Sequence, residues 1–228
     1  MELDKRILKA VYKYVKDGQI IAIGTSTLGE MLLQAIVDKI KRQELKAKIM
    51  PTSFRFANYL VDNQIEIANI NEEEIDLAVE FGNSVDEQFN FIKNESTSFV
   101  RDKMIALSAE ELIVITDEKN FGKLKRTLPL EVMDFGVRKT LIQLESLGDA
   151  RLRMDEKGPI RTETDNVIID LKADEVYSLE DLEIQAKNIP GVIETGLFLR
   201  YADRVLILGD KLTVQSRIEK EKEELIYR

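Results

Sequence analysis

The chain has 228 residues, of which 44% are hydrophobic and 33% charged, a balance typical of a folded globular protein and not of a disordered one. Its formal net charge of -9 argues against a nucleic-acid-binding surface, which needs clustered lysine and arginine. The sequence contains no cysteine and no histidine, which excludes disulfides, thiolate nucleophiles, the usual zinc sites and serine–histidine triads. Carboxylates, lysines, tyrosines and backbone amides remain to carry any catalysis.

The first eighteen residues alternate charged and apolar positions at helical spacing, without the uninterrupted apolar core of a signal peptide. No apolar run approaches the length of a membrane span. We therefore expect a cytoplasmic protein without a membrane partner.

The first half of the chain alternates helical and strand patterns. A helix that includes Ile7 and Val15 is expected to stop at Asp17-Gly18, because glycine readily takes the left-handed conformation that ends helices. The strand 19–23, a turn and a helix to Ile40 follow. Further strands are expected at 46–50, 65–67, 77–79 and 112–115, and further helices at 54–61 and 99–109. Such alternation predicts a parallel sheet covered by helices on both faces, with ligands beyond the carboxyl ends of its strands.

After about Leu130 the pattern is that of a small α+β unit. Helices are expected at 137–147 and 179–188, and strands at 150–154, 166–171 and 192–199. The apolar run 204–208 is expected to return to the first sheet, and the charged tail 218–228 to be a solvated helix end. The predicted organisation is one domain of residues 1–130 and 201–228 with a smaller inserted domain of residues 131–200.

Motifs spread over almost the whole chain resemble those of A-type ribose-5-phosphate isomerases, in the same order and near the same spacing. They are Gly24-Thr25, Pro51-Thr52-Ser53-Phe54, residues 80–106, Gly158-Pro159 and residues 187–198. The resemblance implies an α/β fold, a three-layer αβα domain with a mostly parallel sheet plus a smaller inserted α+β domain. It also implies a homodimer or homotetramer that interconverts ribose 5-phosphate and ribulose 5-phosphate in the pentose phosphate pathway, with no metal or organic cofactor.

This reaction needs a carboxylate that moves a proton between C1 and C2, and polar groups that stabilise the enediolate. The glutamate that serves as base in the family falls on Asp102, which is shorter by one methylene, about 1.5 Å. A misplacement near 1 Å can reduce the rate about a hundredfold. Without the resemblance, an aspartate near a helix start would be interpreted as a partner of the helix dipole.

Two more positions carry over around the sugar. Lys93 falls on the family's lysine at the polyol, and its alternative is a solvent-exposed lysine at a strand end. Glu80 and Asn83 replace two loop aspartates and keep hydrogen-bond acceptors for sugar hydroxyls. Phe81 replaces the glycine between them and restricts the turn.

Residues 94–97, Asn-Glu-Ser-Thr, stand where the family has four glycines. Side chains here restrict the approach of backbone amides to a ligand, and Glu95 brings a like charge toward an anionic substrate. The segment is either a helix-capping turn that uses Ser96 or Thr97, or a reshaped ligand loop in which Ser96 contacts the substrate.

The phosphate is expected at the turn that contains Thr25, Ser26 and Thr27, where hydroxyls and the amides of a helix start could hold it. Strand–turn–helix segments rich in serine and threonine are also common without a ligand. The family's second lysine falls on Asn120, with Lys119 one position away. The segment 162–166 keeps the ends of a family motif but not its glycine, which favours a structural turn.

Two hypotheses remain open. In the first, the chain is an isomerase with Asp102 as base. In the second, it is a non-catalytic relative that binds a sugar phosphate or serves as an assembly partner. The retained carboxylate and Lys93 favour the first, and the lost glycines favour the second.

Overall fold

A computed structural model describes residues 4–174 and 176–217. The charged tail predicted at 218–228 lies outside the described residues. Within them, no helix is long and apolar enough to cross a membrane.

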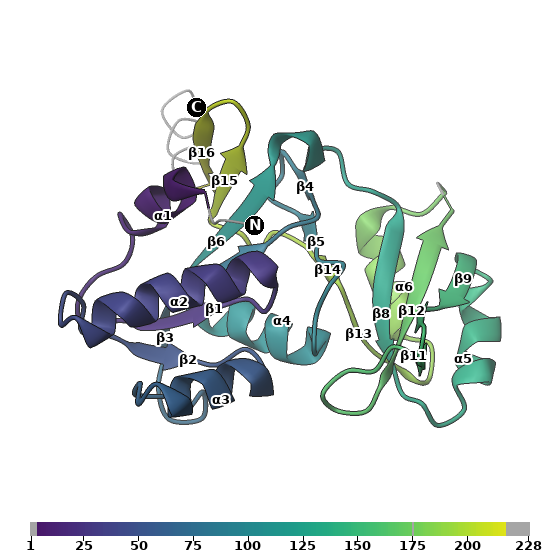
Figure 1. The fold of residues 1–228 in the computed structure, drawn as a ribbon. Coiled ribbons are helices and arrows are strands. Elements are labelled where there is room, and N and C mark those ends of the chain that lie inside the picture. Colours follow the sequence, from purple (N-terminus) through teal and green to yellow (C-terminus); the bar gives the residue numbers. More distant parts are fainter. Residues whose placement is uncertain (1–3, 175, 218–228) are drawn as a thin grey trace.

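A six-stranded sheet forms the centre of the larger unit, at the left of Figure 1. Its strand order is β16-β15-β6-β3-β1-β2, and all neighbours are parallel except β15 and β16. The strands are β1 (Ile20–Ile23), β2 (Lys48–Met50), β3 (Ile75–Phe81), β6 (Ala109–Asp117), β15 (Arg204–Leu208) and β16 (Leu212–Ser216). The segment 204–208 thus returns to the first sheet, as predicted.

Helices cover both faces of this sheet, because successive side chains of its strands point to opposite faces and both sets are buried. Leu77 and Val79 pack in one core with α1, α2 and α3, while Ala78 packs in a second core with α4. The same alternation directs Glu80 to the face covered by α4. The helices of this unit are α1 (Lys5–Val11), α2 (Thr27–Lys41), α3 (Phe54–Asp62) and α4 (Phe99–Ser108). The expected three-layer α/β arrangement with a mostly parallel sheet is confirmed.

The first helix ends earlier than its sequence pattern predicts. It stops at Val11 and does not reach Asp17. The Gln19 side chain accepts a hydrogen bond from the Lys16 amide at 2.7 Å, and Asp17 accepts one from the Lys46 amide at 2.8 Å. The segment forms turns at residues 12–14 and 17–18, and Gly18 takes the predicted left-handed conformation, with φ of 87°.

Short strands next to α4 were not predicted, apart from β14 (Leu197–Phe198), which lies within the predicted strand 192–199, because two or three residues carry too little periodicity. They form a sheet in the order β14-β5-β4-β7. These strands are β4 (Ser84–Asp86), β5 (Phe91–Ile92), β7 (Phe121–Gly122) and β14 (Leu197–Phe198), and the 3-10 helix η1 (Glu118–Asn120) precedes β7. The strand predicted at 65–67 is wrong, since only an isolated bridge between Ile67 and Ile49 forms there.

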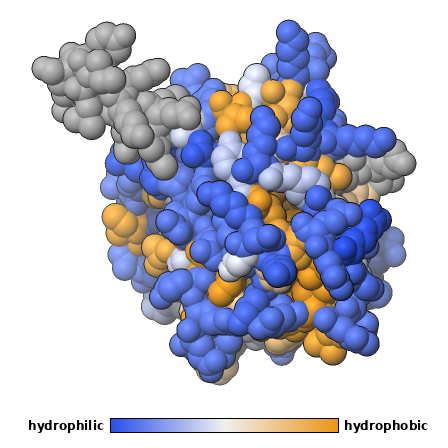
Figure 2. All heavy atoms as spheres, turned by 90° about the vertical axis from the view of Figure 1, so that its left-hand side faces the viewer, coloured by the Kyte–Doolittle hydropathy of each residue, from blue (hydrophilic) through white to orange (hydrophobic). Residues whose placement is uncertain are grey.

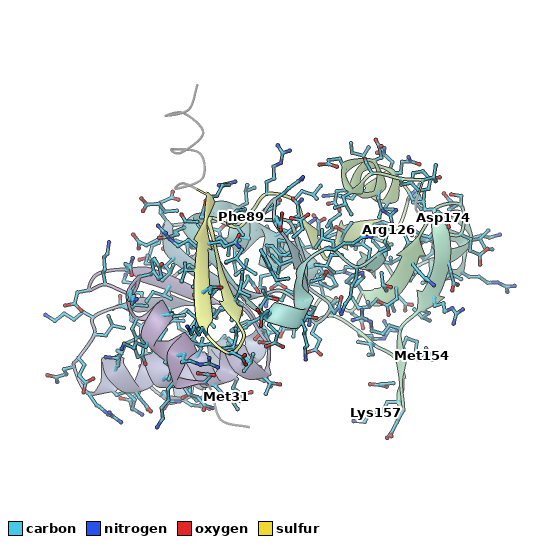
Figure 3. All side chains as sticks on the ribbon, turned by 90° about the horizontal axis from the view of Figure 1, so that it is seen from above. Met31, Phe89, Arg126, Met154, Lys157 and Asp174 are labelled. Atoms are coloured by element: carbon cyan, nitrogen blue, oxygen red, sulfur yellow. The ribbon has the colours of Figure 1, made fainter. Side chains whose placement is uncertain are left out.

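The smaller unit, at the right of Figure 1, has its own hydrophobic core around an antiparallel sheet in the order β13-β8-β12-β9. A hairpin that carries Met154 and Lys157 projects from it in Figure 3, and Arg126 donates to the Asp174 carbonyl at its edge. Its elements are β8 (Thr127–Val132), α5 (Val137–Leu144), β9 (Gly148–Leu152), β10 (Met154–Asp155), β11 (Gly158–Pro159), β12 (Val167–Ala173), α6 (Leu179–Lys187) and β13 (Val192–Thr195). The boundaries at 130 and 200 stay a prediction.

The face of the larger unit in Figure 2 is mostly hydrophilic, and an elongated apolar band runs between the hydrophilic side chains.

Gly196 lies where the two units meet. It divides the predicted strand 192–199, because β13 pairs with β8 while β14 pairs with β5. The Gly196 amide donates to the Pro129 carbonyl at 2.7 Å, and its carbonyl accepts from the Lys93 amide at 2.9 Å. A Cβ atom here would lie 2.5 Å from the Lys93 carbonyl oxygen and 2.6 Å from the Pro129 ring. Glycine is therefore required by close packing.

Gly196→Ala should lower the free energy of unfolding by about 1 to 3 kcal/mol, the usual effect of overpacking a close contact. Chemical denaturation followed by circular dichroism measures this change. An unchanged denaturation midpoint would show that the backbone can open here without loss.

Candidate active site

Three charged side chains from separate elements converge beside the carboxyl end of β3. Glu80 is the last residue but one of β3, Lys93 directly follows β5, and Asp102 lies in the first turn of α4. Side chains of β3 alternate between the two faces of the sheet, which directs Glu80 to the face that α4 covers. Asp102 of α4 therefore lies close to Glu80.

The Lys93 ammonium lies between the two carboxylates. Its Nζ atom is 2.7 Å from Glu80 Oε2 and 2.7 Å from Asp102 Oδ2. Each of the three side chains is only 1% exposed. The alternative of a solvent-exposed strand-end lysine is therefore wrong, and Asp102 contacts a cation in addition to standing near a helix start.

Burial and the charges of the triad shift the pKa values of Glu80 and Lys93. Burial penalises the charged form of Glu80 and raises its pKa to about 7, with the negative charge of Asp102 acting in the same direction and Lys93 opposing it. Burial alone would lower the pKa of Lys93, but attraction by Asp102 and Glu80 outweighs it and raises that pKa. The site thus keeps an ammonium and holds a carboxyl group that exchanges its proton near neutral pH.

Gly24 packs directly on the triad. A Cβ atom at this position would lie 2.1 Å from Glu80 Oε2. The glycine at the end of β1 therefore makes the room that the Glu80 carboxylate occupies.

Several hydrogen bonds hold the segment 94–98 against the site. Its first four residues stand in place of the family's glycines. The Ser96 hydroxyl donates to Asp102 Oδ2 at 2.5 Å and accepts from the Ser98 amide at 2.9 Å. The Asn94 amide donates to Asn83 Oδ1 at 2.8 Å, while Glu95 is exposed. Ser98, and not Ser96 or Thr97, caps α4 by accepting from the Arg101 amide. The structure thus brings Ser96 to the predicted base and Asn83 to the loop.

The three predicted phosphate ligands lie at the start of α2. Thr25 is buried, and its hydroxyl is 2.8 Å from that of Thr52. Ser26 caps α2 by accepting from the Gly29 amide at 2.9 Å, and Thr27 is exposed. The turn is therefore a capped helix start, and of its three hydroxyl residues only Thr27 is exposed.

Lys119 lies in η1, beyond the carboxyl end of β6, with its side chain 79% exposed. Its nearest acidic contact is Asp117, at 3.7 Å. The structure does not bring it to the buried triad.

A carboxylate that sequence reasoning missed lies next to the base helix. Glu131 of β8 is fully buried and accepts hydrogen bonds from the Phe99 amide at 2.8 Å and from the Thr162 hydroxyl at 3.0 Å. A charged residue inside the apolar strand pattern Leu-Pro-Leu-Glu-Val was the available signal.

A cavity of about 460 Å³ adjoins the exposed side of α4. Ser98, Arg101 and Met104 line it together with residues of β2 and of the smaller unit, whereas the triad does not. The charged groups therefore converge on one another at a buried point. Among the described residues, no group of three or more side chains is arranged to hold a metal ion.

Glu80→Gln should change how stability depends on pH. With the folded-state pKa of Glu80 raised to about 7 from about 4.5, the folded protein binds more protons than the unfolded chain between these pH values. The stability that protonated Glu80 contributes is thus lost as pH rises through this window. Relative to the variant, the natural chain should lose on the order of 1 to 3 kcal/mol between pH 4.5 and 7. Urea unfolding of both across this range measures it, and parallel curves would refute it.

Comparisons with known proteins identify the family of the chain. The family model of ribose 5-phosphate isomerase A (phosphoriboisomerase A) matches residues 48–211. The isomerase of Trichodesmium erythraeum is 32% identical over 90% of this chain and 90% of its own, and that of Pyrococcus horikoshii is 29% identical over 90% and 93%.

Solved structures give the same result. A D-ribose-5-phosphate isomerase in complex with phospho-erythronic acid superposes with a TM-score of 0.86 at 28% identity, covering 95% of this chain and 100% of that one. The isomerase of Methanocaldococcus jannaschii gives 0.84 at 26% identity, covering 93% and 97%. The chain belongs to the ribose 5-phosphate isomerase A family.

Proposed function

We propose that this protein interconverts ribose 5-phosphate and ribulose 5-phosphate, with Asp102 as the base. The observation that carries the proposal is the Lys93 ammonium held 2.7 Å from both Asp102 and Glu80 at the carboxyl end of β3. Parallel sheets bind their ligands at this edge. The family's isomerases, one of them solved with a phosphorylated sugar acid, support the same conclusion.

In this proposal each member of the triad has one role. Asp102 removes the proton from C2 of the open-chain aldose and returns it to C1, and the C–H electron pair forms the enediolate double bond between these steps. Lys93 stabilises the negative oxygen of the enediolate. Glu80, whose pKa is raised to about 7 by burial, exchanges a proton with the sugar oxygens. Protons leave and return in equal number, as an isomerisation requires.

The segment 94–98 controls access in this proposal. Since the triad is 1% exposed, a sugar reaches Lys93 only when this segment moves. The hydrogen bonds from Ser96 to Asp102 and from Asn94 to Asn83 open while the sugar enters. The Asn83 side chain is then free to accept from a hydroxyl of the sugar, and the bond from Ser96 to Asp102 forms again before the proton is transferred.

In this proposal the phosphate binds at the start of α2, where the helix dipole favours an anion. The hydroxyls of Ser26 and Thr27 are more available to the phosphate than that of Thr25, because the Thr25 hydroxyl already contacts Thr52. Lys119, exposed beyond the end of β6, supplies positive charge at the same edge of the sheet.

The family supports further features of the proposal. We infer a cytoplasmic homodimer or homotetramer that acts on a sugar phosphate in the pentose phosphate pathway, without a metal or an organic cofactor and without binding nucleic acid or membranes.

Asp102→Asn should abolish turnover of ribose 5-phosphate, with kcat at least about a hundredfold lower, because the amide cannot accept the C2 proton. Formation of ribulose 5-phosphate by the purified protein measures this. Asp76→Asn is the matched control: Asp76 lies at the opposite end of β3 and accepts from the Ile20 amide at 2.7 Å, a bond that asparagine keeps.

The natural protein should convert ribose 5-phosphate to ribulose 5-phosphate, and the Asp76→Asn control should have the same kcat. Absence of turnover at high enzyme concentration would refute the isomerase. A rise in thermal stability with ribose 5-phosphate would then favour a non-catalytic sugar-phosphate binder, since a ligand specific for the native state stabilises it.

Ser96→Ala should lower kcat about tenfold with little change in KM, because its hydroxyl orients the shortened base through a hydrogen bond to a charged acceptor. Steady-state kinetics measure the two constants. Thr97→Val is the matched control in the same segment, since the buried Thr97 hydroxyl has no hydrogen-bond partner among the described residues. Equal kcat for Ser96→Ala and the natural protein would remove Ser96 from the site.

A further inference from the structure

Glu131 is a buried carboxylate to which the reaction described above assigns no role. It lies in β8 of the smaller unit and is 0% exposed. A charge this deep is retained only when hydrogen bonds or counter-charges compensate its lost hydration. Hydrogen bonds from two different segments compensate the charge of Glu131.

One carboxylate oxygen holds the start of the helix that carries the base. Glu131 Oε2 accepts from the Phe99 amide at 2.8 Å, and more weakly from the Val100 amide at 3.4 Å and the Ser98 hydroxyl at 3.5 Å. The first amides of a helix have no partner within the helix, and its dipole favours a negative charge there. Asp102 lies in this same turn, and its amide donates to the Ser98 carbonyl at 3.0 Å.

The other oxygen holds the turn 162–166. Glu131 Oε1 accepts from the Thr162 hydroxyl at 3.0 Å, the Thr164 hydroxyl at 2.9 Å and Asn166 Nδ2 at 2.8 Å. The turn in which the sequence departs from its family is therefore a set of donors for one buried carboxylate. The turn 162–166 thus holds the Glu131 carboxylate, and this carboxylate in turn holds the start of α4.

The same strand also locates Lys93. Two residues before Glu131, the Pro129 carbonyl accepts from the Gly196 amide, whose carbonyl in turn accepts from the Lys93 amide. A single strand of the smaller unit thus holds the backbone of Lys93 and the first turn of α4. These are the two elements whose side chains form the 2.7 Å contact between ammonium and base.

We propose that Glu131 is a positioning residue: its carboxylate fixes the first turn of α4 so that Asp102 is held at the reacting carbon. This rests on the proposed isomerase function. Because misplacement near 1 Å can reduce a rate about a hundredfold, removal of the carboxylate acts on kcat and leaves binding of the sugar phosphate in place.

The test is Glu131→Gln, which keeps the shape but removes the charge and turns one acceptor into a donor. The amide then opposes the Asn166 amide. We expect kcat to fall at least about tenfold with KM within about twofold, measured where circular dichroism shows the variant folded. The double variant Glu131→Gln/Asn166→Asp restores donor and acceptor pairing at the turn and should recover most of kcat. It also serves if the single variant does not fold.

Glu111→Gln is the matched control. Glu111 is a partly buried carboxylate near the amino end of β6, at the opposite end of the sheet from the triad, and its ion pair is with Arg204. It should keep the natural kcat whatever it does to stability.

The outcomes separate the two claims. Turnover by the natural protein together with an unchanged kcat in folded Glu131→Gln would overturn the positioning role and leave the isomerase intact. A folded double variant as slow as the single one, or a loss confined to thermal stability, would overturn it as well. No turnover by the natural protein would instead refute the function itself.

Discussion

The site depends on one ammonium buried between two carboxylates. Each of these charges would be strongly unfavourable at 1% exposure without the others, because removal from water is compensated only by close opposite charge and good geometry. The surrounding backbone is shaped to allow this contact. Gly24 leaves room for Glu80, and Gly196 lets the strand that supports Lys93 approach Pro129. The contact between the charged groups therefore depends on close backbone packing at these two glycines.

In the segment 94–98, side chains stand in place of a glycine loop, and hydrogen bonds give them defined positions at the site. Asn94 and Ser96 bond to Asn83 and Asp102, whereas Glu95 turns to solvent. The like charge that the sequence places near an anionic substrate is thus directed away from the triad. The hydroxyl of Ser96 lies against a base that is one methylene shorter than the family's glutamate.

Much of the larger unit could be predicted, because the burial of β1, β3 and β6 and the faces of α2 and α3 leave clear periodic patterns. Short strands such as β4 and β7 could not, since their pairing comes from distant segments. At the site, Lys93 and Asp102 were found by their place in a motif. Local sequence does not reveal that Lys93 is buried or that Lys119 lies outside the triad.

Glu131 illustrates the limit in another way. Its neighbours in β8 are apolar, and its six hydrogen-bond donors come from residues near 99 and near 164, far from it in sequence. Only the folded arrangement brings these donors to one carboxylate. Thr162, Thr164 and Asn166 then acquire a common purpose that their sequence alone does not disclose.

The attachment of Lys93 and α4 to one strand affects how the protein can move. The helix α4 also packs on the central sheet, with Ile105 and Ala106 in the same core as Ala78 of β3. The base is therefore joined to both units at once. A displacement of β8 relative to β3 would act directly on the contact between the ammonium and the two carboxylates, so the interface between the units forms part of the site.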